Sequence, residues 1–302
     1  MNVIDLIDIT KKYGSFRGVL DLNLQVKQGE IFGFIGPNGA GKSTTIRMLM
    51  GLLSPDRGQV RVLGQLLDRE RPQLRRKIGY LPSEIMLYPG LSGREILAFA
   101  AAAHGMKLDA REVKTYAERL DWNPDRKIRT YSLGNRKKLG IVLSLLHHPE
   151  LIVLDEPTSG LDPLIQNEFF SLLKERSSEE GVTVFFSTHV LSEVEKVCQR
   201  VAFIKEGQLN RISDIGELTD SGDHLISVVF MEDGDMTELY KLRELDEHVL
   251  YDGQHHRLRT GNRLQQTLTA LSQLPLKAIT VRRPTIEEMF MEDYRKGEVK
   301  QA

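Results

Sequence analysis

The chain of 302 residues has little cysteine, no long apolar run and almost no net charge. Its single cysteine, Cys198, cannot form a disulfide bond within the chain. Its longest uninterrupted apolar stretch, residues 96–103, is less than half of the ~20 residues that a membrane-spanning helix needs. A formal net charge of -1 gives no general attraction to nucleic acid. These absences exclude a disulfide scaffold and argue against nucleic acid as a partner.

The N-terminus also lacks a charged segment followed by an apolar run and a small-residue cleavage site, which is the pattern of a secretory signal. We therefore expect a cytoplasmic location, and any role at a membrane would require another chain to do the spanning. A composition of 40% hydrophobic and 27% charged residues is ordinary for a globular protein. The length suits one large domain and a smaller one.

Short apolar runs alternate with helical patterns up to about residue 210. These runs are IFGFI, QVRVL, LIVLD, VTVFFST and RVAFI. The alternation predicts an α/β domain with a largely parallel sheet. Residues 83–148 show long helical patterns and little strand character, which predicts a helical insertion. A smaller second region follows, with strand candidates at 225–230 and 276–281.

Three Ser/Thr-x-x-Glu capping boxes mark expected helix starts, because each partner satisfies a backbone N–H that the helix leaves unpaired. They pair Ser92 with Glu95, Ser192 with Glu195, and Thr285 with Glu288. The last one predicts a terminal helix from about residue 286.

Residues 34–45 read FIGPNGAGKSTT and fit the pattern G-x-x-x-x-G-K-[ST] between a strand candidate and a helix candidate. A glycine-rich loop there turns its backbone N–H groups inward and forms a nest for phosphate at a helix N-terminus. Lys42 would reach the β- and γ-phosphates, and the Ser43 hydroxyl would bind the accompanying Mg²⁺. A flexible turn is the alternative, which the strand and helix context disfavours. The expected nucleotide contacts are Gly36, Pro37, Asn38, Gly39, Ala40, Gly41, Lys42, Ser43 and Thr44.

Two adjacent carboxylates, Asp155 and Glu156, follow the apolar run LIVL. A buried parallel strand delivers its last residues to the sheet edge where ligands bind, and successive side chains point in opposite directions. Asp155 can therefore hold Mg²⁺ while Glu156 orients a water, or accepts its proton, for attack on the γ-phosphorus.

Ser132 stands where a helix N-cap is expected, ahead of the apolar residues LGIVLSLL. The spacing favours a simple capped core helix, and a second anion site at this helix N-terminus remains the alternative. The basic run 136–138 is expected on the outer face of this helix.

The order of GPNGAGKST, YSLGN, LIVLDEP, SGLDP and STH resembles the nucleotide-binding subunit of an ATP-binding cassette (ABC) transporter over residues 1–215. The resemblance implies a P-loop ATPase core with an antiparallel β subdomain and a helical insertion, with ATP and Mg²⁺ as cofactors. Residues 220–302 would then form a small α+β accessory domain.

The resemblance also implies roles for residues outside the loop. Ser132, Gly134 and Asn135 occupy the family's signature segment, where Asn135 replaces the usual glutamine, and this segment binds the γ-phosphate of ATP held by the opposite subunit. Asp162 would lie in the loop that connects the two sites, and His189 would contact the γ-phosphate. One phosphate loop and one signature per chain imply a head-to-tail dimer.

Tyr13 matches the position whose ring stacks on adenine in the family, and a turn-filling tyrosine is the alternative. After IGYLP the family usually has a glutamine that touches Mg²⁺ and senses the membrane partner. This chain has Ser83 followed by Glu84, and serine is too short to reproduce that reach. Three alternatives stay open, namely that Glu84 substitutes for the glutamine, that a water fills the gap, or that the coupling is weaker, so the sequence predicts no metal ligand there.

The segments IGYLPSEIMLYPGLSGREIL and PTIEEMFM resemble the ATP-binding components of ABC-2-type exporters, a group that includes drug-resistance pumps. The expected partners are a membrane-spanning permease and a second ATP-binding subunit, with the chain peripheral on the cytoplasmic side of the membrane. The alternatives are a soluble ABC ATPase, for example of the iron-sulfur assembly type, and a nucleotide-gated regulatory protein.

Overall fold

The structure is a computed structural model, and it describes residues 1–14, 16–67, 72–219, 223–231, 236–246, 249–251, 253–285 and 288. The chain divides into two compact units, Met1–Asp214 and Ile215–Ala302. Each unit has a sheet and a hydrophobic core of its own. Within the described residues, no helix combines the length and the apolar character needed to cross a membrane.

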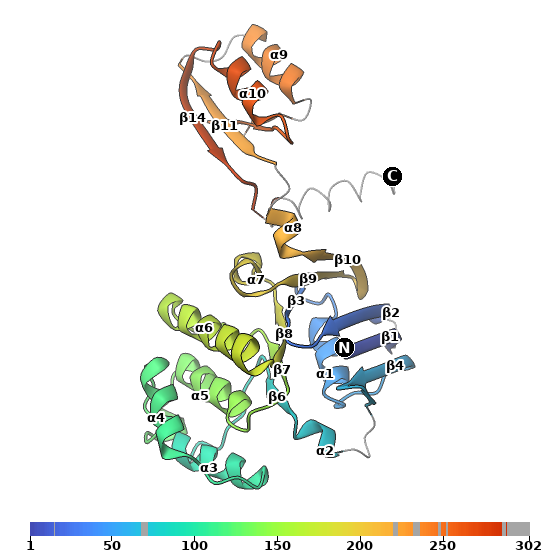
Figure 1. The fold of residues 1–302 in the computed structure, drawn as a ribbon, viewed down its shortest axis with the longest axis vertical. Helices are drawn as coiled ribbons and strands as arrows, with labels where there is room; N and C mark the ends of the chain where they lie inside the picture. Colours follow the sequence, from blue (N-terminus) through green and yellow to red (C-terminus); the bar gives the residue numbers. More distant parts are fainter. Residues whose placement is uncertain are drawn as a thin grey trace. The chain divides into compact units, whose positions relative to one another are not determined.

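A six-stranded sheet in the order β10-β9-β3-β8-β7-β6 forms the centre of the first unit (Figure 1). All neighbours in it are parallel except the edge strand β10. Its strands are β3 (Ile31–Ile35), β6 (Ile78–Leu81), β7 (Leu151–Asp155), β8 (Thr183–Thr188), β9 (Arg200–Lys205) and β10 (Gln208–Asp214). Every residue of β3, β7 and β8 is buried, as expected for parallel strands that are covered on both faces.

A second, antiparallel sheet has the order β2-β1-β4-β5. It consists of β1 (Asn2–Tyr13), β2 (Phe16–Lys27), β4 (Arg57–Val62) and β5 (Gln65–Leu66). The sequence did not predict β1 and β2, because several register shifts between them interrupt the alternation of apolar and polar residues. Helix α1 (Lys42–Leu49) packs against both β7 and the antiparallel sheet, and one core cluster joins all three.

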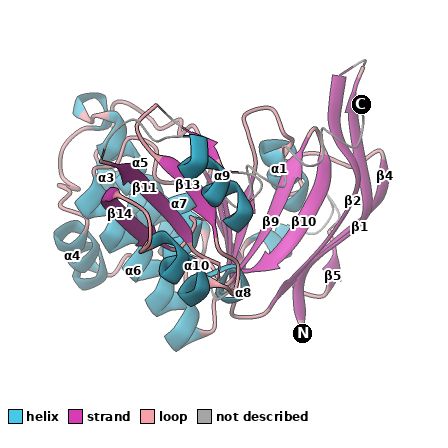
Figure 2. Cartoon of the chain, turned by 90° about the horizontal axis from the view of Figure 1, so that it is seen from above, coloured by secondary structure: helices cyan, strands magenta, loops and turns pink. Residues whose placement is uncertain are grey.

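Helices cover the other face of the six-stranded sheet. They are α3 (Gly93–Ala103), α4 (Ala110–Arg119), α5 (Leu133–Leu145), α6 (Pro163–Glu180) and α7 (Leu191–Val197), with the 3₁₀ turn η1 (Ile128–Thr130). The short α2 (Pro72–Arg75) lies on the side of α1 instead, where Leu74 belongs to the core cluster of α1 and the antiparallel sheet. Figures 1 and 2 both show α3, α4, α5 and α6 on one side of the unit and β1, β2 and β4 on the other. The predicted helical insertion therefore corresponds to α3, α4, η1 and α5.

Of the two capping boxes predicted in the first unit, the structure confirms the one at Ser92 and contradicts the one at Ser192. The capping box of Ser92 and Glu95 is confirmed, with both reciprocal hydrogen bonds present. The prediction for Ser192 is wrong, because α7 begins two residues earlier than a cap at Ser192 implies, with Val190 at the N-cap position and no side-chain cap. The Thr188 hydroxyl accepts the N–H of Val190 at 3.0 Å and donates to the buried Glu193, which fixes the chain before Ser192 is reached.

The second unit begins with α8 (Ile215–Thr219), after which it has the element order βαββαβ of a ferredoxin-like fold. Its elements are β11 (Leu225–Phe230), α9 (Met236–Leu245), β12 (Leu250–Tyr251), β13 (His256–Arg259), α10 (Leu264–Leu271) and β14 (Leu276–Arg282). The sheet order is β12-β13-β11-β14, which confirms the strands expected at 225–230 and 276–281. Reciprocal hydrogen bonds also join Thr285 and Glu288. The helix expected from about residue 286 lies outside the described residues.

Candidate nucleotide-binding and hydrolysis site

The loop between β3 and α1 turns sharply at Gly41. Its φ of 109° is a conformation that glycine adopts readily, and a Cβ atom there would lie 2.8 Å from the carbonyl oxygen of Gly18. No side chain caps the N-terminus of α1. The first backbone N–H groups of α1 are therefore left to be satisfied by an external acceptor, which is what an anion site at a helix N-terminus requires.

Lys42 places its ammonium group inside this loop. The side chain is 5% exposed, and Nζ donates to the carbonyl oxygens of Gly36 at 2.7 Å and Pro37 at 3.2 Å. Nζ also lies 3.5 Å from Oε1 of Glu156. The loop thus combines free backbone donors with a buried positive charge, an arrangement that suits a phosphate.

Asp155 ends β7 at the edge of the sheet that also carries this loop. The side chain is buried, and Oδ1 accepts a hydrogen bond of 2.7 Å from the hydroxyl of Ser187 on β8. The two residues are paired in the parallel register of β7 and β8. Because Ser187 occupies one carboxylate oxygen, the other remains for a cation.

Glu156 is the residue on which the charged groups converge. Its φ of 47° is unusual for a residue with a side chain, and its N–H donates to the carbonyl oxygen of Ser187 at 3.0 Å. Oε1 faces Lys42, and Oε2 lies 3.1 Å from Nδ1 of His189. The loop after β3, the end of β7 and the end of β8 therefore meet at one carboxylate.

The signature segment forms the N-terminus of α5. The hydroxyl of Ser132 accepts the N–H of Asn135 at 3.2 Å, as expected for an N-cap. At Gly134 the backbone runs so close to the next loop that a Cβ atom would lie 2.7 Å from the carbonyl oxygen of Gly160. Asp162 in turn caps α6 and accepts two backbone N–H groups at 3.1 Å.

In the described part of the chain, no hydrogen bond or ion pair joins Ser132 or Asp162 to Lys42, Glu156 or His189. The structure therefore brings the predicted site residues together in two groups. The capping interpretation of Ser132 is confirmed, and its contact with a γ-phosphate stays a prediction.

Tyr13 lies at the end of β1 with 42% of its surface exposed. Its ring packs over Gly18, where a Cβ atom would be 3.1 Å from the ring carbons. Gly18 in turn contacts the loop at Gly41. The ring thus lies near the phosphate loop with enough exposed surface for a flat base, although stacking on adenine stays a prediction.

The prediction for the basic run 136–138 is wrong for two of its three residues. Arg136 is exposed, but Lys137 and Lys138 are buried. Three consecutive residues span about 200° of a helix, so they cannot all face outward when α5 is covered on several sides. Sequence reasoning missed Lys137, whose ammonium group donates to the carbonyl oxygen of Ser83 at 3.0 Å.

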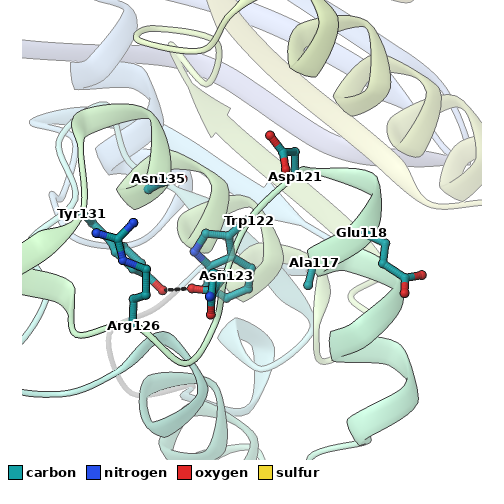
Figure 3. A pocket seen from close by; sticks show the side chains of 8 residues that line it. All are labelled: Ala117, Glu118, Asp121, Trp122, Asn123, Arg126, Tyr131 and Asn135. Carbon is teal, nitrogen blue, oxygen red and sulfur yellow. Dashed lines mark hydrogen bonds between the residues drawn. The ribbon is translucent and has the colours of Figure 1, made fainter.

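A polar cavity of about 300 Å³ lies beside the N-terminal part of α5. Figure 3 shows Trp122, Asn123 and Tyr131 at its wall, and the Tyr131 hydroxyl donates to the carbonyl oxygen of Asn123 at 2.8 Å. The rings of Trp122 and Tyr131 pack edge to face with centroids 6.2 Å apart. Asn135 of the signature segment lines this cavity, whereas the phosphate-loop residues, Asp155 and Glu156 do not.

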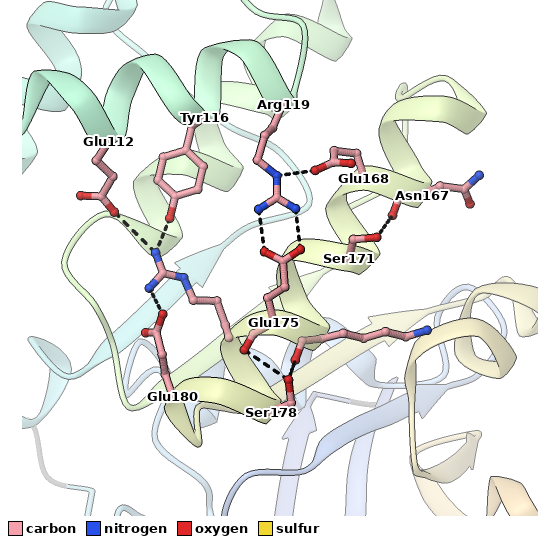
Figure 4. Close-up of polar contacts among 11 residues, drawn as sticks. Glu112, Tyr116, Arg119, Asn167, Glu168, Ser171, Glu175, Ser178 and Glu180 are labelled. Atoms are coloured by element: carbon pink, nitrogen blue, oxygen red, sulfur yellow. Dashed lines mark hydrogen bonds and ion pairs between the residues drawn. The ribbon is translucent and has the colours of Figure 1, made fainter.

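Ion pairs fasten α4 to α6 (Figure 4). Arg119 of α4 is paired with Glu168 and, through two hydrogen bonds of 2.6 and 2.7 Å, with Glu175 of α6. Arg176 of α6 donates to the Tyr116 hydroxyl of α4 at 2.5 Å. Because α6 begins at Asp162, this network ties the helical segment to the loop that follows β7.

The parallel sheet, the phosphate loop and the carboxylates at the end of β7 define a P-loop ATPase. The profile of the family described as ABC transporter matches residues 19–159. The linearmycin resistance ATP-binding protein LnrL of Bacillus subtilis (strain 168) is 33% identical over 301 residues, covering 94% of this chain and 96% of LnrL.

The bacitracin transport ATP-binding protein BcrA of Bacillus licheniformis is 41% identical over 208 residues, which are 68% of each chain. The dimeric structure of MJ0796, a bacterial ABC transporter cassette, has a TM-score of 0.65 and 26% identity, covering 70% of this chain and 98% of MJ0796. The same cassette has been solved with ADP and Pi. The chain belongs to the ABC transporter ATP-binding proteins, and it is an ATP-hydrolysing transporter subunit.

Proposed function

We propose that this chain hydrolyses Mg-ATP at the interface of a head-to-tail dimer and thereby drives export through a separate membrane subunit. The observation that carries the proposal is the division of the site. Glu156 lies between Lys42 and His189, whereas Ser132 belongs to a separate helix N-terminus with no bond to them. A second copy that presents its Ser132 to the phosphates held by Lys42 would complete the site.

Ser43 and Asp155 are suited to hold Mg²⁺. Hydroxyl and carboxylate oxygens are preferred Mg²⁺ ligands, and a nucleotide-bound Mg²⁺ needs only one or two protein carboxylates. The ion would neutralise charge on the phosphates.

The chain's own groups divide the work of hydrolysis. The backbone N–H groups at the start of α1 and the Lys42 ammonium bind the phosphates, while Glu156 orients the attacking water or accepts its proton. His189, whose Nδ1 lies 3.1 Å from Oε2 of Glu156, would hold this carboxylate and contact the terminal phosphate. The present contacts of Lys42 with Glu156 and the loop carbonyls would be exchanged for phosphate oxygens when ATP binds.

The membrane subunit would dock on the helical segment, which would place the chain peripherally on the cytoplasmic side of the membrane. Large apolar side chains exposed there include Met86, Tyr88 and Phe99, and these would supply apolar surface for the docking. Because LnrL and BcrA are named for linearmycin resistance and bacitracin transport, an antibiotic is the proposed class of cargo.

The test is Glu156→Gln, which keeps the shape of the side chain and removes its basicity. We expect the hydrolysis rate to fall by about 10²–10⁴-fold while ATP binding, measured by equilibrium titration, is retained. Glu150→Gln is the matched control, because Glu150 forms an exposed pair with Lys77. Continued hydrolysis by Glu156→Gln would refute the assigned role, and an inactive wild type would favour a nucleotide-gated regulatory protein.

A further inference from the structure

Lys137 is a buried charge that the mechanism above does not use. Its side chain on α5 is 1% exposed, and no carboxylate of the described residues forms an ion pair with it. Nζ donates to the carbonyl oxygens of Ser83 at 3.0 Å and Pro82 at 3.4 Å. An ammonium group has three donors, so one remains. Burial of a charge costs several kcal/mol in general. This cost makes the Lys137 ammonium group a candidate for a functional role.

The register of the sheet shows what lies next to this ammonium group. Leu81 of β6 pairs with Leu154 of β7 in parallel, so Pro82 and Ser83 leave the sheet beside Asp155 and Glu156. Neighbouring strands are about 4.8 Å apart. The group that contacts the Ser83 carbonyl is therefore about one strand away from the carboxylates at the end of β7.

The pKa of Lys137 agrees with a position of its ammonium group close to the carboxylates. Burial lowers the pKa of Lys137, and the carboxylates of Asp155 and Glu156 act in the opposite direction. Both carboxylates are thus close enough for their charge to act on the ammonium group. Lys42 approaches Glu156 from the phosphate loop, so a second lysine, from the signature helix, acts on the same carboxylate.

The helix that carries Lys137 is packed tightly against the same segment. Gly140 lies three residues further along α5, on the same face. A Cβ atom at Gly140 would lie 2.3 Å from Cδ1 of Ile85 and 2.6 Å from Cδ1 of Leu81. The stretch 81–85 therefore cannot move independently of α5, and Lys137 forms the polar end of this contact.

We infer that Lys137 is a positioning residue, which fixes the Pro82–Ser83 segment against the carboxylate edge of the sheet and supplies a positive charge beside Glu156. In this chain it would take over, from the signature helix, the link that a glutamine at position 83 would otherwise make. The inference rests on the role proposed for Glu156. The inference also explains why a serine suffices at position 83. Its side chain is too short to reach the site, but its backbone carbonyl oxygen accepts the hydrogen bond from Lys137.

Lys137→Met tests this inference, because methionine keeps the length and apolar stem but removes the charge and the donors. We expect kcat for ATP hydrolysis to fall by at least about tenfold, with KM changed by less than about twofold, as for a misplaced reacting group. The matched control is Lys138→Met. Lys138 is also buried on α5 and donates to a backbone carbonyl, that of Asp121, at 2.9 Å, so it reports the cost of losing such a lysine elsewhere.

Ser83→Gln in the Lys137→Met background provides a rescue that a purely structural role would not predict. The amide restores a polar link from the segment to the carboxylate edge, and we expect kcat to recover at least about threefold. If Lys137→Met does not yield folded protein, Lys137→Gln is measured instead with the same expectation. This variant keeps a donor for the Ser83 carbonyl and loses the charge.

Wild type and Glu156→Gln are assayed alongside these variants. If Glu156→Gln hydrolyses ATP as wild type does, the proposed function fails and the inference with it. If Glu156→Gln is inactive while Lys137→Met or Lys137→Gln keeps wild-type kcat, only the inference is overturned. Equal losses in the Lys137 and Lys138 variants, without recovery by Ser83→Gln, would also overturn it.

Discussion

The N-termini of α1 and α5 are both predicted to bind phosphate, and they are built differently. At α1 the cap is Gly41, no side chain satisfies the first N–H groups, and Lys42 lies buried beside them. At α5 the Ser132 hydroxyl accepts an N–H of its own helix. The α1 end therefore leaves its first N–H groups to an external acceptor, whereas at the α5 end a side chain already satisfies one of them.

The residues that surround the N-termini of α1 and α5 also differ. Near α1 are the carboxylate of Glu156 and the imidazole of His189, to which we assign roles in hydrolysis. Near α5 is the backbone of Gly160. Asp162, which caps α6, follows two residues later in the same loop. Under the proposed function, the α1 end binds the phosphates and activates the water, and the α5 end adds donors to a phosphate that is already bound. This asymmetry is what a site shared between two copies would require.

Among the substitutions that test this comparison, Lys42→Met should cause the largest loss of ATP hydrolysis. Removal of the buried ammonium group takes away a charged donor at the γ-phosphate, and we expect hydrolysis to fall by about 10²–10³-fold. Affinity for ATP should fall as well, since the same group binds the ground state. Steady-state phosphate release and ATP titration would measure the two effects. Unchanged affinity would mean that the phosphates bind elsewhere.

Ser132→Ala should have a smaller effect of a different kind. Loss of the cap lowers the free energy of unfolding by about 1 kcal/mol, and we expect hydrolysis to fall by at least about tenfold. ATP binding to the isolated chain should be unchanged, because Ser132 has no contact with the α1 loop. Calorimetric unfolding and ATP titration test both statements. A weaker affinity in the isolated chain would contradict the division of the site.

Inorganic tripolyphosphate with Mg²⁺ should give the smallest effect. At ten times its dissociation constant, a ligand of the folded state adds about 1.4 kcal/mol, or about 4 °C in Tm for a unit of this size. We expect Ser132→Ala to keep this shift and Lys42→Met to lose it, as measured by thermal unfolding. The opposite pattern would assign the phosphates to α5.

Local motifs made the phosphate loop and the carboxylates predictable. The glycine at φ 109° and the lysine after it are set by a few neighbouring residues, and a four-residue apolar strand places Asp155 at the sheet edge. Contacts between distant residues were not predictable in this way. The hydrogen bond from Ser187 to Asp155 joins residues 32 positions apart and depends on the order of the strands.

The buried lysines show the same limit. A run of three basic residues favours an exposed face, and only the packing of α5 against 81–85 shows that Lys137 faces inward. The predicted start of α7 was wrong by two residues, because Thr188 and Glu193 bond to each other across the turn. Burial and non-local hydrogen bonds, rather than propensity, decided these cases.

The central claim is that each catalytic site takes its loop from one copy and its signature from another. The most direct measurement is ATP hydrolysis after Lys42→Met and Ser132→Ala chains are mixed. In a mixed head-to-tail dimer one site carries both changes and the other carries neither, so we expect the mixture to exceed the activity of either variant alone. If activity in the mixture is only the average of the two variants at every ratio, the loop and signature act within one chain and the account is contradicted.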